Sequence, residues 1–265
     1  MGQLTRPTAL LLDFGGVVVA TTNRPTWANE LATELHTALS AAGCRELSVE
    51  HIEADLKAGS AADSHWKNAM SRPAAPEEMT HQRFWSDFVA ADWPAAAHAW
   101  VTAHADPLCH RLGELKQDRT TRQGMSELLD TCDDLGIAVA IVSNALAGSV
   151  HRAYMAEHGL DKRVAVQVYS DEVAVRKPNP EMIRIAARAL DTDPAGCWYV
   201  GDNYDRDVLC GRRAGAGATV LMEARGTYDR PYIVQAEPDA VVGDPDELRG
   251  LLLGAPVPPA RRETP

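Results

Sequence analysis

The stretch Leu10–Val19 reads LLLDFGGVVV and carries the strongest indication of the fold. Its first residues form an apolar run typical of a buried β-strand, and Asp13 stands at the carboxyl end of that run, before two glycines. A strand holds such a carboxylate in place, and glycines allow backbone N–H groups to approach a ligand closely. An aspartate here can also simply begin a turn, so its meaning depends on the rest of the chain.

The composition indicates a globular protein that does not bind nucleic acid. The chain has 265 residues, of which 45% are hydrophobic and 24% are charged, and its formal net charge is −11. This length suits one large domain or a core with a smaller second domain. No basic surplus is present to neutralise phosphates, so we expect no nucleic-acid partner. A small anionic substrate remains compatible, because a local site can be positive within an acidic protein.

Cysteine usage and the absence of long apolar segments favour a cytoplasmic location. The five cysteines are widely spaced and odd in number, which argues against a disulfide framework or a zinc knuckle. Residues 1–7 lack an apolar signal segment, and no stretch approaches the length of a membrane span. We expect a cytoplasmic monomer or homodimer without a membrane partner. The Pro- and Arg-rich tail, residues 256–265, is expected to be disordered.

Two different sequence patterns predict a Rossmann-like parallel α/β core interrupted by an all-helical cap domain. Short apolar strands alternate with helical patterns after residue 119, which predicts a parallel sheet covered on both faces. The intervening stretch is rich in Ala, Trp and His, has helical spacing and shows no convincing β run. We assign residues 1–19 and 119–255 to the core and residues 20–118 to the cap.

The expected elements follow from these patterns and from local start and stop signals. Asn179 and Pro180, for example, suit the N-cap and the first position of a helix. The expected strands are 8–14, 137–142, 164–169, 198–200, 218–221 and 240–242. The expected helices are 27–42, 48–70, 76–91 and 95–115 in the cap, and 122–134, 147–158, 180–190, 206–215 and 246–253 in the core.

Polar residues follow the expected strands at their carboxyl ends, where ligands bind in sheets of this kind. One edge thus carries a nucleophile, hydroxyl and amide donors, a cation and further carboxylates, the parts that phosphoryl transfer needs. Each residue has an ordinary alternative, such as a helix cap, a solvated loop lysine or a turn. Their joint occurrence in this order favours the functional interpretation. The residues are Asp13, Ser143, Asn144, Lys177, Asp202 and Asp207.

These segments resemble the four motifs of the haloacid dehalogenase (HAD) superfamily, in order and at matching strand ends. The resemblance covers residues 5–20 and 119–253, and the insert is similar in position to the helical C1 cap of subfamily I. The first motif, DFGGV, and the run Ser170–Val173 that leads into Arg176–Pro178 are similar to a sugar-phosphatase-like branch. The resemblance therefore implies a HAD hydrolase.

The resemblance implies a Mg²⁺-dependent phosphomonoester hydrolase that acts on a small, sugar-like phosphorylated metabolite through a phosphoaspartyl intermediate on Asp13. Hard oxygen ligands suit that ion. The implied catalytic residues are Asp13, Ser143, Lys177 and Asp207. The implied phosphate-binding residues are Phe14, Gly15, Ser143, Asn144 and Lys177. The implied metal ligands are Asp13, the backbone carbonyl of Gly15, and Asp202.

Gly15 departs from the pattern of HAD phosphatases, which usually carry a second aspartate two residues after the nucleophile. That aspartate protonates the leaving oxygen and then activates water, and glycine can do neither. A phosphatase would need another acid or base, or a substrate with a better leaving group, such as an anomeric sugar phosphate. The candidate groups are Asp205, Asp207, His36, His65 and His81.

Gly15 also opens alternatives to a phosphatase. A phosphomutase of this fold would need the missing aspartate, whereas phosphonate and carbon–halogen hydrolases lack it. A phosphonate reaction would need a cap lysine, Lys57 or Lys67, and dehalogenation is less favoured because Asp202 preserves a metal site. A HAD-like protein that binds without turnover is the remaining alternative, and the joint retention of the strand-end residues argues against it.

Substrate contacts are expected in the linkers between core and cap and on the inner face of the cap, which closes over the site. The first linker is polar and includes an arginine and a tryptophan, which suit a hydroxylated, phosphorylated ligand. The expected substrate contacts are Asn23, Arg24 and Trp27. The other tryptophans of the insert are expected to pack in its core.

Overall fold

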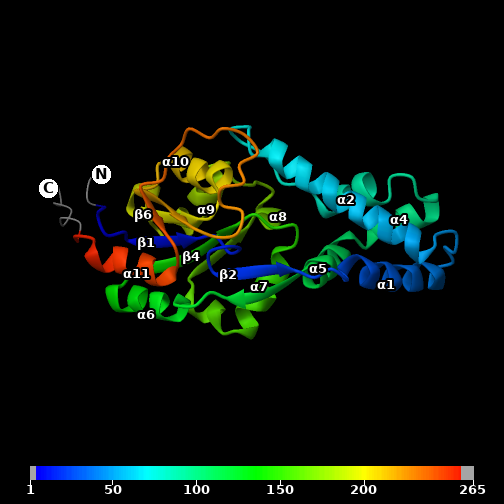
Figure 1. The fold of residues 1–265 in the computed structure, drawn as a ribbon, viewed down its shortest axis with the longest axis horizontal. Helices are drawn as coiled ribbons and strands as arrows, with labels where there is room; N and C mark the ends of the chain where they lie inside the picture. Colours follow the sequence, from blue (N-terminus) through cyan, green and yellow to red (C-terminus); the bar gives the residue numbers. More distant parts are fainter. Residues whose placement is uncertain (1–3, 258–265) are drawn as a thin grey trace.

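The computed structural model describes residues 4–257 and contains a six-stranded parallel sheet (Figure 1). The strand order is β5-β4-β1-β6-β7-β8, and every neighbouring pair is parallel. The parallel α/β fold predicted from the sequence is confirmed. Residues 258–265 of the expected tail lie outside the described residues. The strands are β1 (Ala9–Leu12), β4 (Ala138–Ser143), β5 (Val166–Tyr169), β6 (Cys197–Gly201), β7 (Ala218–Met222) and β8 (Ala240–Val242).

Helices cover both faces of the sheet, because alternate residues of each strand point to opposite sides. Leu10 and Leu12 pack in one cluster with α6 and α11, whereas Ala9 and Leu11 pack in another with α9 and α10. Figure 1 shows these two helix pairs on opposite sides of the sheet. The helices of the core are α6 (Met125–Leu135), α7 (Gly148–Glu157), α8 (Ser170–Val173), α9 (Glu181–Ala189), α10 (Leu209–Ala214) and α11 (Pro245–Gly254).

The insert forms a helical body that extends away from the sheet (Figure 1). It has its own buried cluster, in which Leu35, Leu56 and Trp85 take part, and Val150 of α7 in the core joins that cluster. No helix among residues 4–257 has the length and apolar character needed to cross a membrane. The insert contains α1 (Trp27–Ala41), α2 (Val49–Met70), α3 (His81–Arg83), a π-helical turn (Phe84–Val89), α4 (Ala95–Ala103) and α5 (Ala105–Lys116).

The two ends of the insert pair as a β-ribbon that the sequence analysis did not predict. β2 (Val19–Asn23) and β3 (Gln117–Thr121) run antiparallel, with Thr21 opposite Arg119. The stretch 20–118, expected to be all-helical, therefore begins and ends in strands. Threonines recur in both strands and favour extended backbone, but nearly a hundred residues separate the partners, so local periodicity could not reveal the pairing.

Two expected helices of the insert differ from the structure for local reasons. Residues 76–80 of the expected helix 76–91 are extended, because Glu77 bridges to Val175 of the core and Thr80 caps the short helix that follows. The expected helix 95–115 is divided at His104. Pro107, in the first turn of α5, has no N–H and its ring would clash with a preceding helical carbonyl, so a continuous helix is disfavoured.

A loop of the insert forms a further contact with the core, centred on a buried ion pair. Arg176 Nη1 lies 2.7 Å from Glu78 Oε1, and their side chains are only 1% and 4% exposed. The hydroxyl of Ser170 donates to Glu78 Oε2, and the backbone N–H of Glu78 donates to the carbonyl of Ala174 at 3.1 Å. The insert is thus joined to the core at the ribbon and again at this buried pair, next to Lys177.

We expect Glu78→Gln to lower the free energy of unfolding by about 3–5 kcal/mol, because it leaves the buried Arg176 guanidinium without a counter-charge. The double variant Glu78→Gln/Arg176→Met should recover most of this loss, since neither charge is then buried. Urea unfolding measures all three proteins. Glu181→Gln, which breaks the exposed pair with Arg188, is the control and should cost less than about 1 kcal/mol. Equal losses at Glu78 and Glu181 would contradict the prediction.

Candidate active site

Three central strands deliver polar residues to one edge of the sheet. Asp13 follows β1, Ser143 ends β4 and Asp202 follows β6, and these three strands are neighbours. Asp13 and Ser143 are buried, and the Ser143 hydroxyl hydrogen-bonds to the Asp13 carboxylate. The carboxyl ends of parallel strands point the same way, so this convergence follows directly from the topology.

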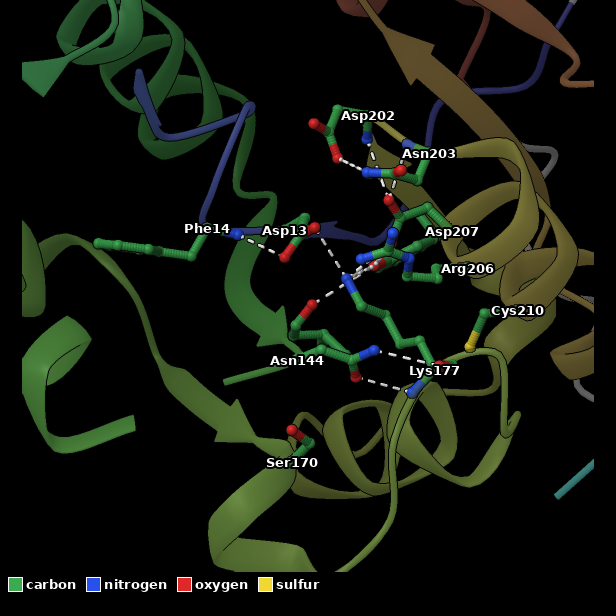
Figure 2. Close-up of polar contacts among 12 residues, drawn as sticks. Asp13, Phe14, Asn144, Ser170, Lys177, Asp202, Asn203, Arg206, Asp207 and Cys210 are labelled. Atoms are coloured by element: carbon green, nitrogen blue, oxygen red, sulfur yellow. Dashed lines mark hydrogen bonds and ion pairs between the residues drawn. The ribbon is translucent and has the colours of Figure 1, made fainter. Parts of the chain in front are cut away.

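Lys177 lies at the centre of the site and contacts two carboxylates (Figure 2). Its Nζ is 2.9 Å from Asp13 Oδ2 and 2.6 Å from Asp207 Oδ1, and it donates to the Tyr199 hydroxyl at 2.7 Å. Burial opposes the charged form, but the two carboxylates outweigh it and raise the pKa of Lys177 above its ordinary value. Burial also raises the pKa of Asp13, and Lys177 counteracts that shift. Lys177 is therefore a fixed cation beside the nucleophile candidate.

Asn144 fixes the backbone that carries Lys177. Its Nδ2 donates to the Lys177 carbonyl at 3.1 Å, and its Oδ1 accepts from the Lys177 backbone N–H at 2.7 Å. The Asn144 side chain is thus occupied by this loop. Figure 2 shows it beside the Lys177 backbone, while the Phe14 ring points away from the carboxylates.

Asp207 has both carboxylate oxygens engaged. Oδ1 accepts from Tyr199 at 2.8 Å in addition to Lys177, and Oδ2 accepts from the backbone N–H groups of Asp202 and Asn203 at 3.1 and 2.9 Å. Burial would raise the pKa of Asp207, but Lys177, Tyr199 and the Asn203 N–H together hold it below its ordinary value. A carboxylate so fully engaged suits a positioning role and is poorly suited to carry a proton.

The carboxylates of Asp13 and Asp202, with Asp207 beside them, could hold a divalent cation. One oxygen from each lies within 4.8 Å of the others. Burial, Asp207 and Asp13 raise the pKa of Asp202 to about 8, so the cluster favours an additional positive charge. Hard carboxylate oxygens match the donors that Mg²⁺ prefers.

The two glycines after Phe14 have different structural roles. Gly16 has a φ of +77°, and a Cβ placed on it would lie 2.3 Å from Asp202 Oδ2, so this position requires glycine. Gly15 lies outside the left-handed region, and a Cβ placed on it would meet nothing within 4 Å. Gly16 thus makes room for Asp202, whereas the space beside Gly15 is open.

A cavity of about 730 Å³ includes this site, and only one of the three expected substrate contacts lines it. Asn23 lines it, together with other residues of the β-ribbon, but Arg24 and Trp27 do not. Arg24 instead pairs with Glu30 at 3.0 Å, and the Trp27 ring lies 5.7 Å from Lys116 Nζ. The described cap helices contribute no lining residue, so the ribbon and the core loops form the wall.

The expected acid or base candidates also lie apart from the cavity, except Asp207. His36, His65, His81 and Asp205 are not among its lining residues. His81 Nδ1 instead lies 2.7 Å from Asp106 Oδ1.

Several lining residues were not anticipated from the sequence. Arg119 lies on β3, Arg206 follows β6, and the loop after β7 contributes Arg225 and Asp229. His151 of α7 also lines the cavity and stacks on Phe14, with ring centroids 4.1 Å apart. The sequence carried one usable signal: the segment after β7 is another carboxyl end of a strand in the same sheet.

Comparison with known proteins supports this assignment of the fold. The family model for haloacid dehalogenase-like hydrolases matches residues 7–215. A HAD phosphatase from Thermococcus onnurineus has a TM-score of 0.59 and 18% identity, covering 94% of this chain and 99% of its own. A 2-haloacid dehalogenase from Pseudomonas syringae has a TM-score of 0.60 and 15% identity, covering 92% and 97%. At these identities the structures show a shared fold alone.

Three curated relatives are phosphatases, and the matched segments cover only part of each. N-acetylmuramic acid 6-phosphate phosphatase of Pseudomonas putida is 34% identical over 131 residues, 49% of this chain and 57% of the relative. Phosphoserine phosphatase of Thermus thermophilus is 34% identical over 113 residues, 43% of each chain. Phosphoglycolate phosphatase of Xanthomonas campestris is 31% identical over 126 residues, 47% and 55%. The chain thus spans about half the length of these relatives, and with the family model matching most of its residues, it belongs to the haloacid dehalogenase-like hydrolases.

Proposed function

We propose that this protein is a Mg²⁺-dependent phosphomonoester hydrolase that acts on a small phosphorylated metabolite, with Asp13 as the nucleophile. The observation that carries the proposal is Lys177, which contacts Asp13 and Asp207 at once in a cavity that also holds Asp202. Three carboxylates and a cation thus surround one space, which supports the proposal because phosphoryl transfer requires a nucleophile, a cation and metal ligands. The named phosphatase relatives support the same class of substrate.

The proposed reaction has two steps, the formation and the hydrolysis of a phosphoaspartate. An Asp13 oxygen forms a bond to phosphorus while the bond from phosphorus to the leaving oxygen breaks, giving a phosphoaspartate. Ser143 and the backbone N–H groups of Phe14, Gly15 and Asn144 donate to phosphate oxygens, and Lys177 balances the negative charge that develops. Water then cleaves the phosphoaspartate, which releases inorganic phosphate and restores the carboxylate.

Asp13, Asp202 and the Gly15 carbonyl would hold Mg²⁺, with Asp207 in support. When bound, the ion supplies positive charge that stabilises the phosphate oxygens in the transition state. Gly15 supplies no side-chain acid, so the leaving oxygen takes its proton from cavity water or from the substrate. A sugar-like phosphate with a good leaving group fits this limitation, because it needs less protonation.

The positions of the two cap lysines argue against a phosphonate hydrolase. Lys57 Nζ lies 2.6 Å from Glu53 Oε1, and Lys67 Nζ lies 2.6 Å from Asp63 Oδ2. Neither lysine lines the cavity, so neither is placed to form a Schiff base with a phosphonate substrate. The three-carboxylate cluster favours a metal-assisted reaction over dehalogenation.

Phosphate release from a panel of phosphomonoesters, with Mg²⁺ and with EDTA, tests this proposal. The panel includes anomeric and non-anomeric sugar phosphates, a phosphonate and a haloacid. We expect release from phosphomonoesters with Mg²⁺, loss with EDTA and recovery on renewed addition of Mg²⁺. Release that EDTA leaves unchanged would contradict the metal site. Turnover of the phosphonate or haloacid alone would contradict a phosphatase.

A further inference from the structure

The cavity is positively charged although the protein is acidic. Its wall contains four arginines and Lys177 against four aspartates, whereas the whole chain has a formal net charge of −11. Three of the aspartates and Lys177 belong to the catalytic cluster, and a divalent cation there would neutralise them. The remaining wall then has a surplus of positive charge, provided by Arg119, Arg122, Arg206 and Arg225 against Asp229.

Arg119 combines two features that the other wall arginines do not share: it is half-buried, and only two backbone carbonyls accept from its guanidinium. By contrast, Arg206 lies 3.6 Å from Asp205, Arg122 donates to three carbonyls, and Arg225 is exposed.

Arg119 lies on β3, and its Nη1 and Nη2 donate to the carbonyls of Gln117 and Gly113, each at 3.0 Å. Among residues 4–257, no carboxylate lies within 4.0 Å of its guanidinium nitrogens. Burial lowers the pKa of Arg119. The pKa of an ordinary guanidinium is so high that the group remains charged.

Several arginines outside the cavity meet a carboxylate. Arg111 lies 2.8 Å from Glu34 and 3.0 Å from Glu114, and Arg152 lies 2.6 Å from Glu172. A half-buried guanidinium that faces a cavity without such a partner retains unused donors, since five N–H groups are available and the two carbonyls take two. Its planar fork matches a carboxylate or a phosphate group.

The other residues of the β-ribbon that line the cavity are uncharged. Burial and the nearby Arg119 lower the pKa of His151 to about 3, so this imidazole is neutral, and its Nδ1 has no hydrogen-bond partner in the described chain. Thr21, Asn23 and Gln117 line the same side of the cavity with uncharged polar groups. The wall can therefore receive one further anionic group alongside polar atoms of the ligand.

We propose that Arg119 binds a second anionic group of the substrate, a carboxylate or a second phosphate, so that this enzyme selects phosphomonoesters carrying two anionic groups. The inference rests on the proposed phosphatase function and narrows its substrate class. It assigns to Arg119 a role in specificity, separate from the chemistry at Asp13.

Matched substrate pairs test this proposal. Phosphoglycolate is compared with 2-hydroxyethyl phosphate, which replaces the carboxylate by an alcohol, and glucose 1,6-bisphosphate is compared with glucose 1-phosphate. kcat/KM is measured with Mg²⁺ for wild type, Arg119→Gln, Arg119→Lys and Arg111→Gln. The first pair detects a carboxylate and the second a phosphate. Arg111→Gln removes the same charge from an arginine outside the cavity.

We expect wild type to prefer the doubly anionic member of at least one pair. Arg119→Gln should lower kcat/KM for that member by about 10- to 100-fold, the range for hydrogen bonds to charged groups, and change its singly anionic partner less than about threefold. Arg119→Lys should retain part of the preference, and Arg111→Gln all of it. A purely structural role in the ribbon would lower both members equally.

The possible failures are distinguishable. Wild-type turnover of both members at equal rates, or an equal loss for both in Arg119→Gln, overturns this inference and leaves the phosphatase in place. Absence of phosphate release from all four compounds and from the phosphomonoester panel would overturn the proposed function, and the inference with it.

Discussion

Asp13→Asn is expected to reduce phosphate release by about 10⁴–10⁶-fold, the range seen when a covalent nucleophile is removed. The amide cannot form the phosphoaspartate, and Lys177 loses the partner that lies 2.9 Å from its Nζ. Phosphate release with Mg²⁺ measures the effect. Acid-quenched wild type should in addition carry phosphate on the peptide containing Asp13, and the variant should not.

Asp229→Asn is the matched control for this loss. It makes the same change of carboxylate to amide in the same cavity, at a residue outside the Lys177 cluster. We expect its rate to remain within a few-fold of wild type. Asp13→Asn should fold normally, because burial raises the pKa of Asp13 and the folded state therefore tolerates a neutral group there. Comparable phosphate release by Asp13→Asn and wild type would refute the covalent mechanism.

Gly15→Asp is expected to raise the hydrolysis of simple alkyl phosphates by about 10²–10⁴-fold, the usual contribution of one general acid or base. The position can accept a side chain, since a Cβ there meets no atom within 4 Å and the backbone does not require glycine. The new carboxyl group would protonate the leaving oxygen and then activate water. Wild type lacks that group, so the poorest leaving groups should gain most.

Gly15→Asn separates acid–base chemistry from the effects of size. It adds a side chain of nearly the same volume that cannot exchange a proton, and we expect it to be no faster than wild type. Initial rates with ethyl phosphate and with 4-nitrophenyl phosphate, whose leaving group needs little protonation, give the comparison. Equal rates for Gly15→Asp and Gly15→Asn on ethyl phosphate would show that the missing aspartate does not limit this enzyme.

The sequence predicted the parallel sheet and which residues stand at its strand ends, because both follow from local patterns. Apolar runs give the strands, and the common direction of parallel strands brings Asp13, Ser143 and Asp202 to one edge. Lys177 was placed at the same edge because its loop follows a predicted strand, but local patterns could not predict which carboxylates it contacts. The structure shows it buried between two carboxylates.

The cavity wall was not predictable in the same way, because it depends on contacts between distant segments. Arg119 faces the cavity only through the pairing of β2 with β3, and Arg225 only through the path of the loop after β7. Helical spacing likewise predicted a helix over residues 76–80, which are extended because Glu77 forms a β-bridge with Val175 of the core. Contacts between distant segments determine where these residues lie, whereas local propensity determines where the strands form.

The buried pair of Glu78 and Arg176 limits how the two bodies of this protein can move. The two adjacent strands of the ribbon alone would allow the cap to rotate about a single hinge. The buried ion pair lies away from that hinge, so it must break before such a rotation can occur. The ribbon and the loop containing Arg225, which both line the cavity, would then keep their relative positions when a ligand binds.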